Sequence, residues 1–138
     1  MQLYFAASIR GGRELQPVYA AIVGHLRQSG HTVLSEHVAS ASVEVDEPGE
    51  TDRDIYVQDM GWLDQAAAVI AEVTVPSLGV GYEIAYALHA RAIPVLGLCR
   101  AGTRLSAMLT GCTHPLFRLA FYDDLPAALA AVDRFLQA

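Results

Sequence analysis

Short apolar runs alternate along this chain with longer segments whose apolar residues recur every three or four positions. The apolar runs have the length of strands and lie at 3–7, 32–35, 69–73, 93–98 and 119–122. The helix-like segments lie at 14–29, 52–66, 81–90, 104–109 and 125–136. Five strands that alternate with helices predict an α/β fold, in which helices cover both faces of a doubly wound, Rossmann-like or flavodoxin-like parallel sheet.

The length of the chain favours one domain that spans residues 1–138. Ligands of doubly wound sheets bind beyond the carboxyl ends of the strands. The loops after the first and third strands both lie at that edge, so we expect the functional residues within 7–13 and 75–83.

Hydrophobic residues make up 53% of the chain, and the mean hydropathy of +0.30 is high for a small protein. No apolar run reaches the length of a membrane span, so we expect no membrane partner. The surplus apolar surface is better explained by a subunit interface, in a homodimer or a larger assembly. The net charge is −6 and all nine basic residues are arginine, which argues against a nucleic acid polymer but allows a mononucleotide.

The two cysteines, Cys99 and Cys112, are too few for a disulfide framework. The chain opens on an apolar strand, with no sign of a secretory signal. Both features fit a reducing compartment, and we expect a cytoplasmic protein.

The segment from Pro76 to Glu83 joins a predicted strand to a predicted helix and reads Pro-Ser-Leu-Gly-Val-Gly-Tyr-Glu. A strand, a glycine-containing loop and a helix N-terminus in this order direct free backbone N–H groups at an anion. Glu83 would lie in the first turn of the helix, where the helix dipole favours its ionised form. A phosphate cradle beside a fixed carboxylate indicates a nucleotide site with chemistry, although Glu83 could also do no more than complement the dipole.

The loop after the first strand, Ser8–Arg13, reads Ser-Ile-Arg-Gly-Gly-Arg. Its glycines allow close backbone approach and its arginines offer fork-shaped donors to a phosphate; the alternative is a glycine turn with solvated arginines. Neither this loop nor 76–83 has the G-x-G-x-x-G order of a dinucleotide site, and a chain without lysine has no Walker motif. We expect no cofactor.

Asp59 lies four residues after Ile55 and four before Leu63, on the apolar stripe of its predicted helix. A carboxyl group there faces the core or a cleft, where burial raises its pKa as a general acid requires. A low-pKa Glu83 beside a high-pKa Asp59 would form the carboxyl pair of a retaining glycosidase. The alternative for Asp59 is a structural carboxylate bonded to the N–H groups of a neighbouring loop.

Three further features leave alternatives open. Tyr4, on the first strand, could reach the pocket or be a core residue, and His37, at the end of the second strand, could be catalytic or a structural donor. The acidic segment 40–50 is either a solvated loop or a lid over the site. The other histidines show no metal-ligand spacing, and we expect no metal.

Five stretches, which follow one another in a recognisable order, span nearly the whole chain: residues 4–13, 36–38, 58–63, 76–83 and 105–108. Together they resemble the 2′-deoxynucleoside 5′-phosphate N-hydrolases of the nucleoside 2-deoxyribosyltransferase-like superfamily. The resemblance implies an N-glycosidase that cleaves a deoxynucleoside 5′-monophosphate to a free base and 2-deoxyribose 5-phosphate. It also implies that Glu83 attacks C1′ and forms a glycosyl-enzyme intermediate, that Asp59 protonates the leaving base, and that Tyr4 positions the nucleophile.

The same resemblance implies a phosphate site and a dimer. Ser77 and Gly79 would hold the 5′-phosphate, together with Ser106 from the neighbouring subunit of a homodimer. The other candidates for the substrate pocket are Ser8, Ile9, Arg10, Gly11 and His37. We expect an apolar wall near C2′ to reject ribonucleotides, since a buried hydroxyl without a partner is penalised.

Two other functions stay open. A nucleoside 2-deoxyribosyltransferase would use the same carboxyl pair but pass the sugar to another base, and it would favour donors with a free 5′-hydroxyl. A non-catalytic nucleotide-binding module would keep the phosphate loop, although the presence of both Asp59 and Glu83 argues against it. The sequence does not determine which base is preferred.

Overall fold

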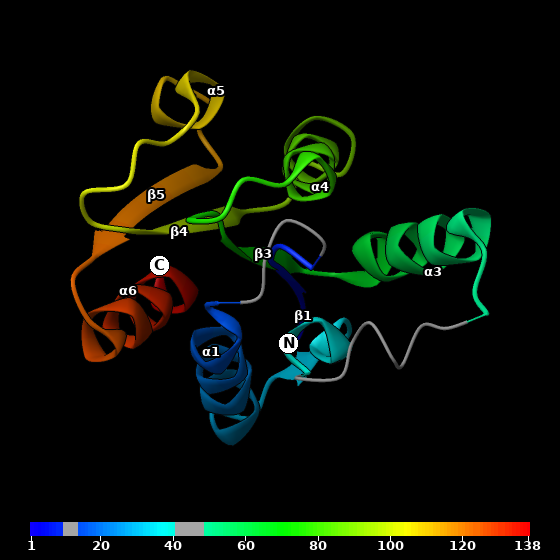
Figure 1. Cartoon of the computed structure of the whole chain (residues 1–138), viewed down its shortest axis with the longest axis horizontal. Helices are drawn as coiled ribbons and strands as arrows, with labels where there is room; N and C mark the ends of the chain where they lie inside the picture. The colour runs from blue at the N-terminus through cyan, green and yellow to red at the C-terminus, as the bar shows by residue number, and fades with distance from the viewer. Residues whose placement is uncertain (10–13, 41–48) are drawn as a thin grey trace.

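Five parallel strands form one sheet in the computed structural model, which describes residues 1–9, 14–40 and 49–138. The order of the strands across the sheet is β2-β1-β3-β4-β5 (Figure 1). Their bounds are β1 (Gln2–Ala6), β2 (Thr32–Val33), β3 (Ala68–Glu72), β4 (Val95–Arg100) and β5 (Phe117–Tyr122). The predicted doubly wound parallel sheet is therefore confirmed.

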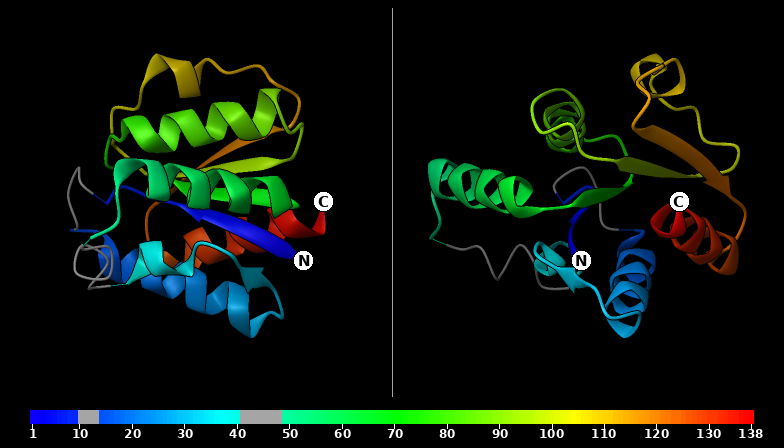
Figure 2. Two further views of the ribbon diagram at one scale, coloured as in Figure 1. Left: turned by 90° about the vertical axis from the view of Figure 1, so that its right-hand side faces the viewer. Right: turned by 180° about the vertical axis from the view of Figure 1, so that it is seen from behind.

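Helices cover both faces of this sheet, as Figures 1 and 2 show. One face carries α1 (Gln16–Gln28), the 3₁₀ helix η1 (Glu36–Ala39) and α6 (Leu125–Gln137). The other face carries α3 (Asp52–Gln65), α4 (Leu78–His89) and the short α5 (Ala107–Thr110). In the described part of the chain, no helix combines the length and the apolar character needed to cross a bilayer.

Alternate residues of the central strands supply two core layers. In β3, Ile70 packs in the layer with α1 and α6, whereas Val69 and Ala71 pack in the layer with α3 and α4. A strand that is buried on both faces is mostly apolar, which explains why Ala68–Ala71 of β3 are all apolar and why Glu72 at its end stands out.

The order of the strands reverses next to β1, because β2 is added on one side of β1 and β3 on the other. Leu3 of β1 pairs with Val33 of β2 on one side and with Ala68 of β3 on the other. The loops that leave the carboxyl ends of β1 and β3 therefore diverge to opposite sides of the sheet. This topological switch point is where open α/β sheets bind their ligands.

Side-chain caps fix where the helices begin. The Thr51 hydroxyl accepts a hydrogen bond from the Asp54 N–H, and the Asp54 carboxylate accepts one from the Thr51 N–H, both at 3.1 Å. The Ser77 hydroxyl accepts from the Val80 N–H at 3.3 Å and so begins α4. These two caps set the positions of Asp59 and Glu83 along their helices.

Two predicted boundaries are wrong in ways that affect the site. Helix α4 begins at Leu78 rather than at Gly81, because Ser77 caps it, so Gly79 and Gly81 lie inside the helix and not in a loop. Strand β2 ends at Val33, and His37 lies in η1 rather than at the end of the strand.

Candidate active site

A cleft of about 790 Å³ opens between α3 and α4, beyond the carboxyl ends of the strands. Residues Ala7 and Ile9, which follow β1, lie at its base. Asp59 lines it from α3 and Glu83 lines it from α4. The two carboxyl groups that the sequence singled out thus face one cavity from opposite walls.

Tyr4 lies beneath these carboxyl groups. It is 1% exposed on β1, and its hydroxyl donates a hydrogen bond to Glu83. Burial, and next the charge of Asp59, raise the pKa of Glu83 to about 8, while the hydrogen bond from Tyr4 acts in the opposite direction. Burial and the two nearby carboxylates raise the pKa of Tyr4, so its phenol stays protonated and remains a donor.

The prediction that the helix N-terminus keeps Glu83 ionised is wrong. Because α4 begins at Leu78, Glu83 lies in the second turn, beyond the free N–H groups of the first turn. Burial and the repulsion from Asp59 dominate and raise the pKa of Glu83 instead. The pair therefore holds one shared proton at neutral pH, and the hydrogen bond from Tyr4 favours the anionic form of Glu83.

The N-terminus of α4 forms one rim of the cleft. The Ser77 side chain and backbone carbonyl accept from the N–H groups of Val80, at 3.3 Å, and Gly81, at 3.2 Å. The N–H groups of Leu78 and Gly79 precede the first hydrogen bonds of the helix and point outward from its end. Such an end attracts an anion, as the sequence predicted for Ser77 and Gly79, although the donors belong to a helix and not to a glycine loop.

Two tyrosines at the cleft were missed by the sequence analysis. Tyr56 of α3 and Tyr82 of α4 both line the cleft, with their hydroxyls 3.4 Å apart and their rings edge to face at 6.3 Å. The available signals were the position of Tyr56, three residues before Asp59 on the same face of α3, and the position of Tyr82 next to Glu83.

The two walls of the cleft are also tied at their far ends. Tyr86 of α4 donates to the Asp64 carboxylate of α3 at 2.6 Å. Arg91, just after α4, donates to the Asp64 carbonyl at 2.7 Å, and its Nε lies 3.7 Å from the carboxylate. These contacts hold α3 and α4 side by side and so help to fix the spacing of Asp59 and Glu83.

Of the other predicted site residues, Ile9, Ser77 and Gly79 line the cleft with Asp59 and Glu83. The remaining described candidates do not line the cavity: Ser8 is fully buried, the ring centroids of His37 and Trp62 are 5.2 Å apart, and Ser106 is an exposed cap of α5. Arg10 and Gly11, and most of the acidic segment 40–50, lie outside the described residues.

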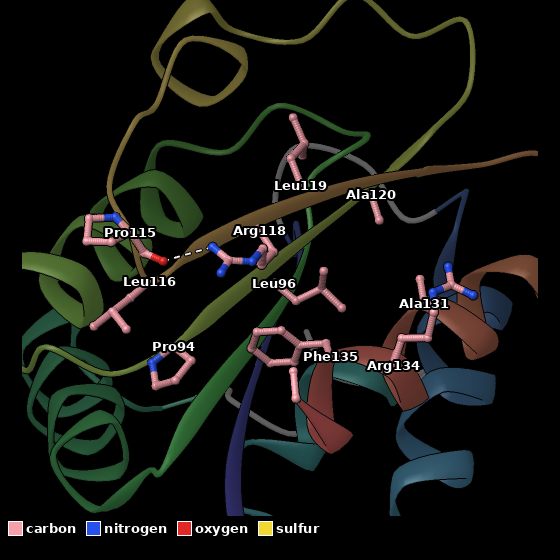
Figure 3. A pocket seen from close by; sticks show the side chains of 11 residues that line it. Pro94, Leu96, Pro115, Leu116, Arg118, Leu119, Ala120, Ala131, Arg134 and Phe135 are labelled. Carbon is pink, nitrogen blue, oxygen red and sulfur yellow. Dashed lines mark hydrogen bonds between the residues drawn. The ribbon is translucent and has the colours of Figure 1, made fainter.

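A second cavity, of about 410 Å³, lies between α6 and the start of β5 (Figure 3). Its walls are mostly apolar side chains such as Leu96 and Phe135, and its charged side chains are Arg118 and Arg134. One Arg118 nitrogen donates to the Pro115 carbonyl at 2.8 Å. The lining of this cavity contains no side-chain carboxyl group, so it lacks the acid and base that the cleft provides.

No three histidine, cysteine, aspartate or glutamate side chains gather as a metal site would require, within the ranges that the structure describes. The cleft itself brings together two carboxyl groups, with a buried phenol bonded to one of them, next to the N-terminus of α4.

Comparisons with known proteins identify the family to which the chain is similar. The sequence model of the nucleoside 2-deoxyribosyltransferase family matches residues 3–121. The chain is 52% identical over 113 residues to the 5-hydroxymethyl-dUMP N-hydrolase of Rattus norvegicus, covering 79% of this chain and 68% of the rat protein. It is 42% identical over 136 residues to a candidate 2′-deoxynucleoside 5′-phosphate N-hydrolase 1 of Methanosarcina mazei, covering 99% of this chain and 84% of the relative.

The fold has a counterpart among solved structures. The CMP N-glycosidase of Clostridium botulinum superposes with a TM-score of 0.74, covering 98% of this chain and 99% of that chain. The sequence identity between the two is 16%, so this match concerns the fold alone.

Proposed function

Since the chain belongs to the nucleoside 2-deoxyribosyltransferase family, we propose that it is an N-glycosidase acting on 2′-deoxynucleoside 5′-monophosphates. It releases the free base and 2-deoxyribose 5-phosphate. Relatives that are named N-hydrolases of such nucleotides support the substrate class. The observation that carries the proposal is the meeting of Asp59 and Glu83 at one cleft, with the buried Tyr4 bonded to Glu83, beside the free N-terminus of α4.

The reaction needs an anion at C1′ and an acid at the base. A Glu83 oxygen bonds to C1′ while the C1′–N bond breaks, and the departing base takes the proton from Asp59. Water then attacks C1′ and gives a proton to the Asp59 carboxylate, which releases Glu83 and the sugar phosphate. Tyr4 stabilises the Glu83 anion before attack and after release by donating its hydrogen bond.

The 5′-phosphate binds at the N-terminus of α4, with the Ser77 hydroxyl and the Gly79 N–H as donors. Asp52, Asp59 and Glu83 line the cleft, and none of the described lining residues is basic. We therefore assign the neutralising charge to Arg10. Ile9, which lines the cleft, completes the wall around the sugar and the base. Phosphate binding supplies the energy that orients C1′ over Glu83.

The site is completed by a second copy of the chain, whose Ser106 reaches the phosphate. Ser106 is exposed and lies outside the cleft of its own protomer. Leu78 at the rim of the cleft is 97% exposed, and Met108 beside Ser106 is 82% exposed. Large apolar side chains exposed near a functional residue are typical of an interface, which supports the homodimer. Both cysteines are free, which fits a reducing, cytoplasmic location.

A panel of deoxynucleoside monophosphates tests the proposal, with the released base as the readout. We expect turnover of dGMP, little turnover of GMP, and little turnover of deoxyguanosine. Equal rates with dGMP and GMP would reject the apolar wall near C2′. Failure to release a base from any member of the panel would reject the enzyme.

The family to which the chain belongs also includes transferases, so the same assay needs an acceptor base in parallel. New nucleoside formed from the added base would identify a 2-deoxyribosyltransferase. Binding of the nucleotides without release of base, both in the wild type and in Glu83→Ala, would identify a non-catalytic binding module.

A further inference from the structure

Glu72 is a second glutamate with an unusual environment, which the proposed reaction does not use. It ends β3 and is 0% exposed. Strand alternation places it on the same face as Ile70, toward α1 and α6, and away from Tyr4, Asp59 and Glu83. A fully buried carboxyl group costs free energy unless its oxygens are satisfied, so its partners indicate what it does.

Each oxygen of Glu72 accepts hydrogen bonds. One oxygen accepts from the backbone N–H of Thr74 at 2.7 Å. The other accepts from the Thr74 hydroxyl at 2.9 Å and from the Tyr122 hydroxyl. Burial raises the pKa of Glu72, while the donors Tyr122 and Thr74 and the charge of Arg100 act to lower it. Two of these hydrogen bonds come from Thr74, which lies two residues after the end of β3.

Thr74 is thereby fixed on several sides. Its hydroxyl oxygen also accepts from the Arg100 N–H of β4 at 2.9 Å, and the preceding residue, Val73, donates its N–H to the Leu98 carbonyl at 2.8 Å. Only Val75 and Pro76 separate Thr74 from Ser77, the cap of α4. Proline restricts the backbone of that short connection, so a shift at Thr74 is passed on to Ser77 with little absorbed on the way.

We propose that Glu72 is a positioning residue for the phosphate site: through Thr74 it fixes where Ser77 and the first N–H groups of α4 lie. The inference rests on the proposed function. Donors on a helix end bind a phosphate best when they are held in place before the ligand arrives, and rigid support behind the loop supplies that order. Glu72, Thr74 and Tyr122 are not among the described residues that line the cleft, so the network acts on binding and not on bond cleavage.

The matched pair Thr74→Val and Thr74→Ser tests this role. Valine keeps the shape but removes the hydroxyl that bonds to Glu72 and accepts from Arg100, whereas serine keeps that hydroxyl. For Thr74→Val we expect KM for a deoxynucleoside monophosphate, and Kd for 2-deoxyribose 5-phosphate measured by calorimetry, to rise about tenfold with kcat within about twofold. For Thr74→Ser we expect wild-type values.

A merely structural role would give a different pattern. Loss of folded enzyme lowers the apparent kcat and leaves KM and Kd unchanged, and thermal melting measures that loss separately. Tyr122→Phe removes one hydrogen bond from the same Glu72 carboxylate and leaves both bonds between Glu72 and Thr74 in place, so its KM is expected to stay within about twofold of wild type. If Thr74→Val does not fold, Glu72→Gln takes its place, with a smaller rise in KM.

Unchanged KM and Kd in Thr74→Val would overturn the inference while leaving the enzyme intact. Equal increases in Tyr122→Phe and Thr74→Val would also overturn it, because the effect would then belong to the buried cluster in general. Absence of turnover in the wild type would instead reject the proposed function, and the positioning role with it.

Discussion

Glu72 and Glu83 are two carboxyl groups whose pKa is raised by burial, at the same edge of the sheet, yet their surroundings differ. The oxygens of Glu72 accept from Thr74 and Tyr122, and Glu72 faces no other carboxyl group among its described partners. Glu83 lines an open cleft, receives a hydrogen bond from Tyr4 and faces Asp59.

The difference shows that a raised pKa does not by itself identify a catalytic group. Desolvation acts on both residues, but at Glu72 the donors offset its cost, and this makes the carboxylate part of the fold. At Glu83 a like charge adds to the cost, and a cleft gives a substrate access. In the proposed reaction, the second combination leaves a carboxylate poorly stabilised until a cationic centre such as C1′ arrives.

Replacing Glu83 tests this comparison most strongly. For Glu83→Gln we expect kcat to fall by about 10⁴-fold, because an amide cannot form the bond to C1′. Substrate affinity, measured by calorimetry with dGMP, is expected to stay near the wild-type value. Glu72→Gln is the matched control and is expected to keep most of its kcat. A larger loss of kcat in the control than in Glu83→Gln would reverse the roles assigned to the two glutamates.

Asp59→Asn removes the partner that sets Glu83 apart from Glu72. We expect kcat to fall by about 10³-fold through loss of the acid. In the wild type, kcat/KM is expected to decrease above about pH 8, where the carboxyl pair loses its shared proton. The measurement is the pH profile of kcat/KM for both proteins, with base release as the readout. A variant that keeps the same high-pH decrease would show that the acid is another group.

Glu72→Ala tests the structural half of the comparison. It leaves the N–H and hydroxyl of Thr74 and the hydroxyl of Tyr122 without their acceptor, and it opens a hole in the core. We expect the free energy of unfolding to fall by about 3 kcal/mol. Urea denaturation of the variant and the wild type measures it. A loss below about 0.5 kcal/mol would mean that the buried network contributes no more to the free energy of unfolding than a solvent-exposed ion pair does.

Glu83→Gln is expected to have the opposite effect on stability. The pKa of Glu83 is about 8 in the fold and near 4.5 in the unfolded chain, so the folded state binds the extra proton between these values. Wild-type stability therefore decreases as pH rises from about 5 to about 8, and the neutral amide avoids this decrease. We expect Glu83→Gln to be more stable than wild type by about 2 kcal/mol at pH 8, with the advantage lost near pH 5. Equal stability at both pH values would contradict the raised pKa.

The sequence predicted the positions of these groups better than their electrostatics. The period of apolar residues around Asp59 placed it on the face of α3 that lines the cleft. Gly79 and Gly81 led to the wrong prediction of a loop before α4, because the cap at Ser77 begins the helix and the two glycines lie inside it.

Local sequence patterns do not indicate how far a side chain is buried by residues that are distant along the chain. The predicted position of Glu83 near a helix N-terminus favoured its ionised form, whereas burial and the charge of Asp59, which arise only in the folded protein, raise its pKa. Glu72 was read as part of an apolar strand, and the signal that could have revealed it was the glutamate itself, within a run that is otherwise apolar. Its partner Tyr122 is 50 residues away along the chain and only the folded sheet brings the two together.

Tyr4→Phe is expected to have the smallest effect on activity, and it tests the difference between Glu83 and Glu72 at a single hydrogen bond. The hydrogen bond from Tyr4 lowers the pKa of Glu83, so its removal raises that pKa further and leaves Glu83 protonated more of the time. We expect kcat/KM at neutral pH to fall about tenfold, with the rise of activity on the acidic side of the pH profile shifted to higher pH by about one unit. Tyr122→Phe, which removes the corresponding hydrogen bond from Glu72, is the control and is expected to leave the pH profile in place. If both variants shifted the profile equally, the phenol at Tyr4 would have no special relation to the nucleophile, and the contrast between the two glutamates would rest on Asp59 alone.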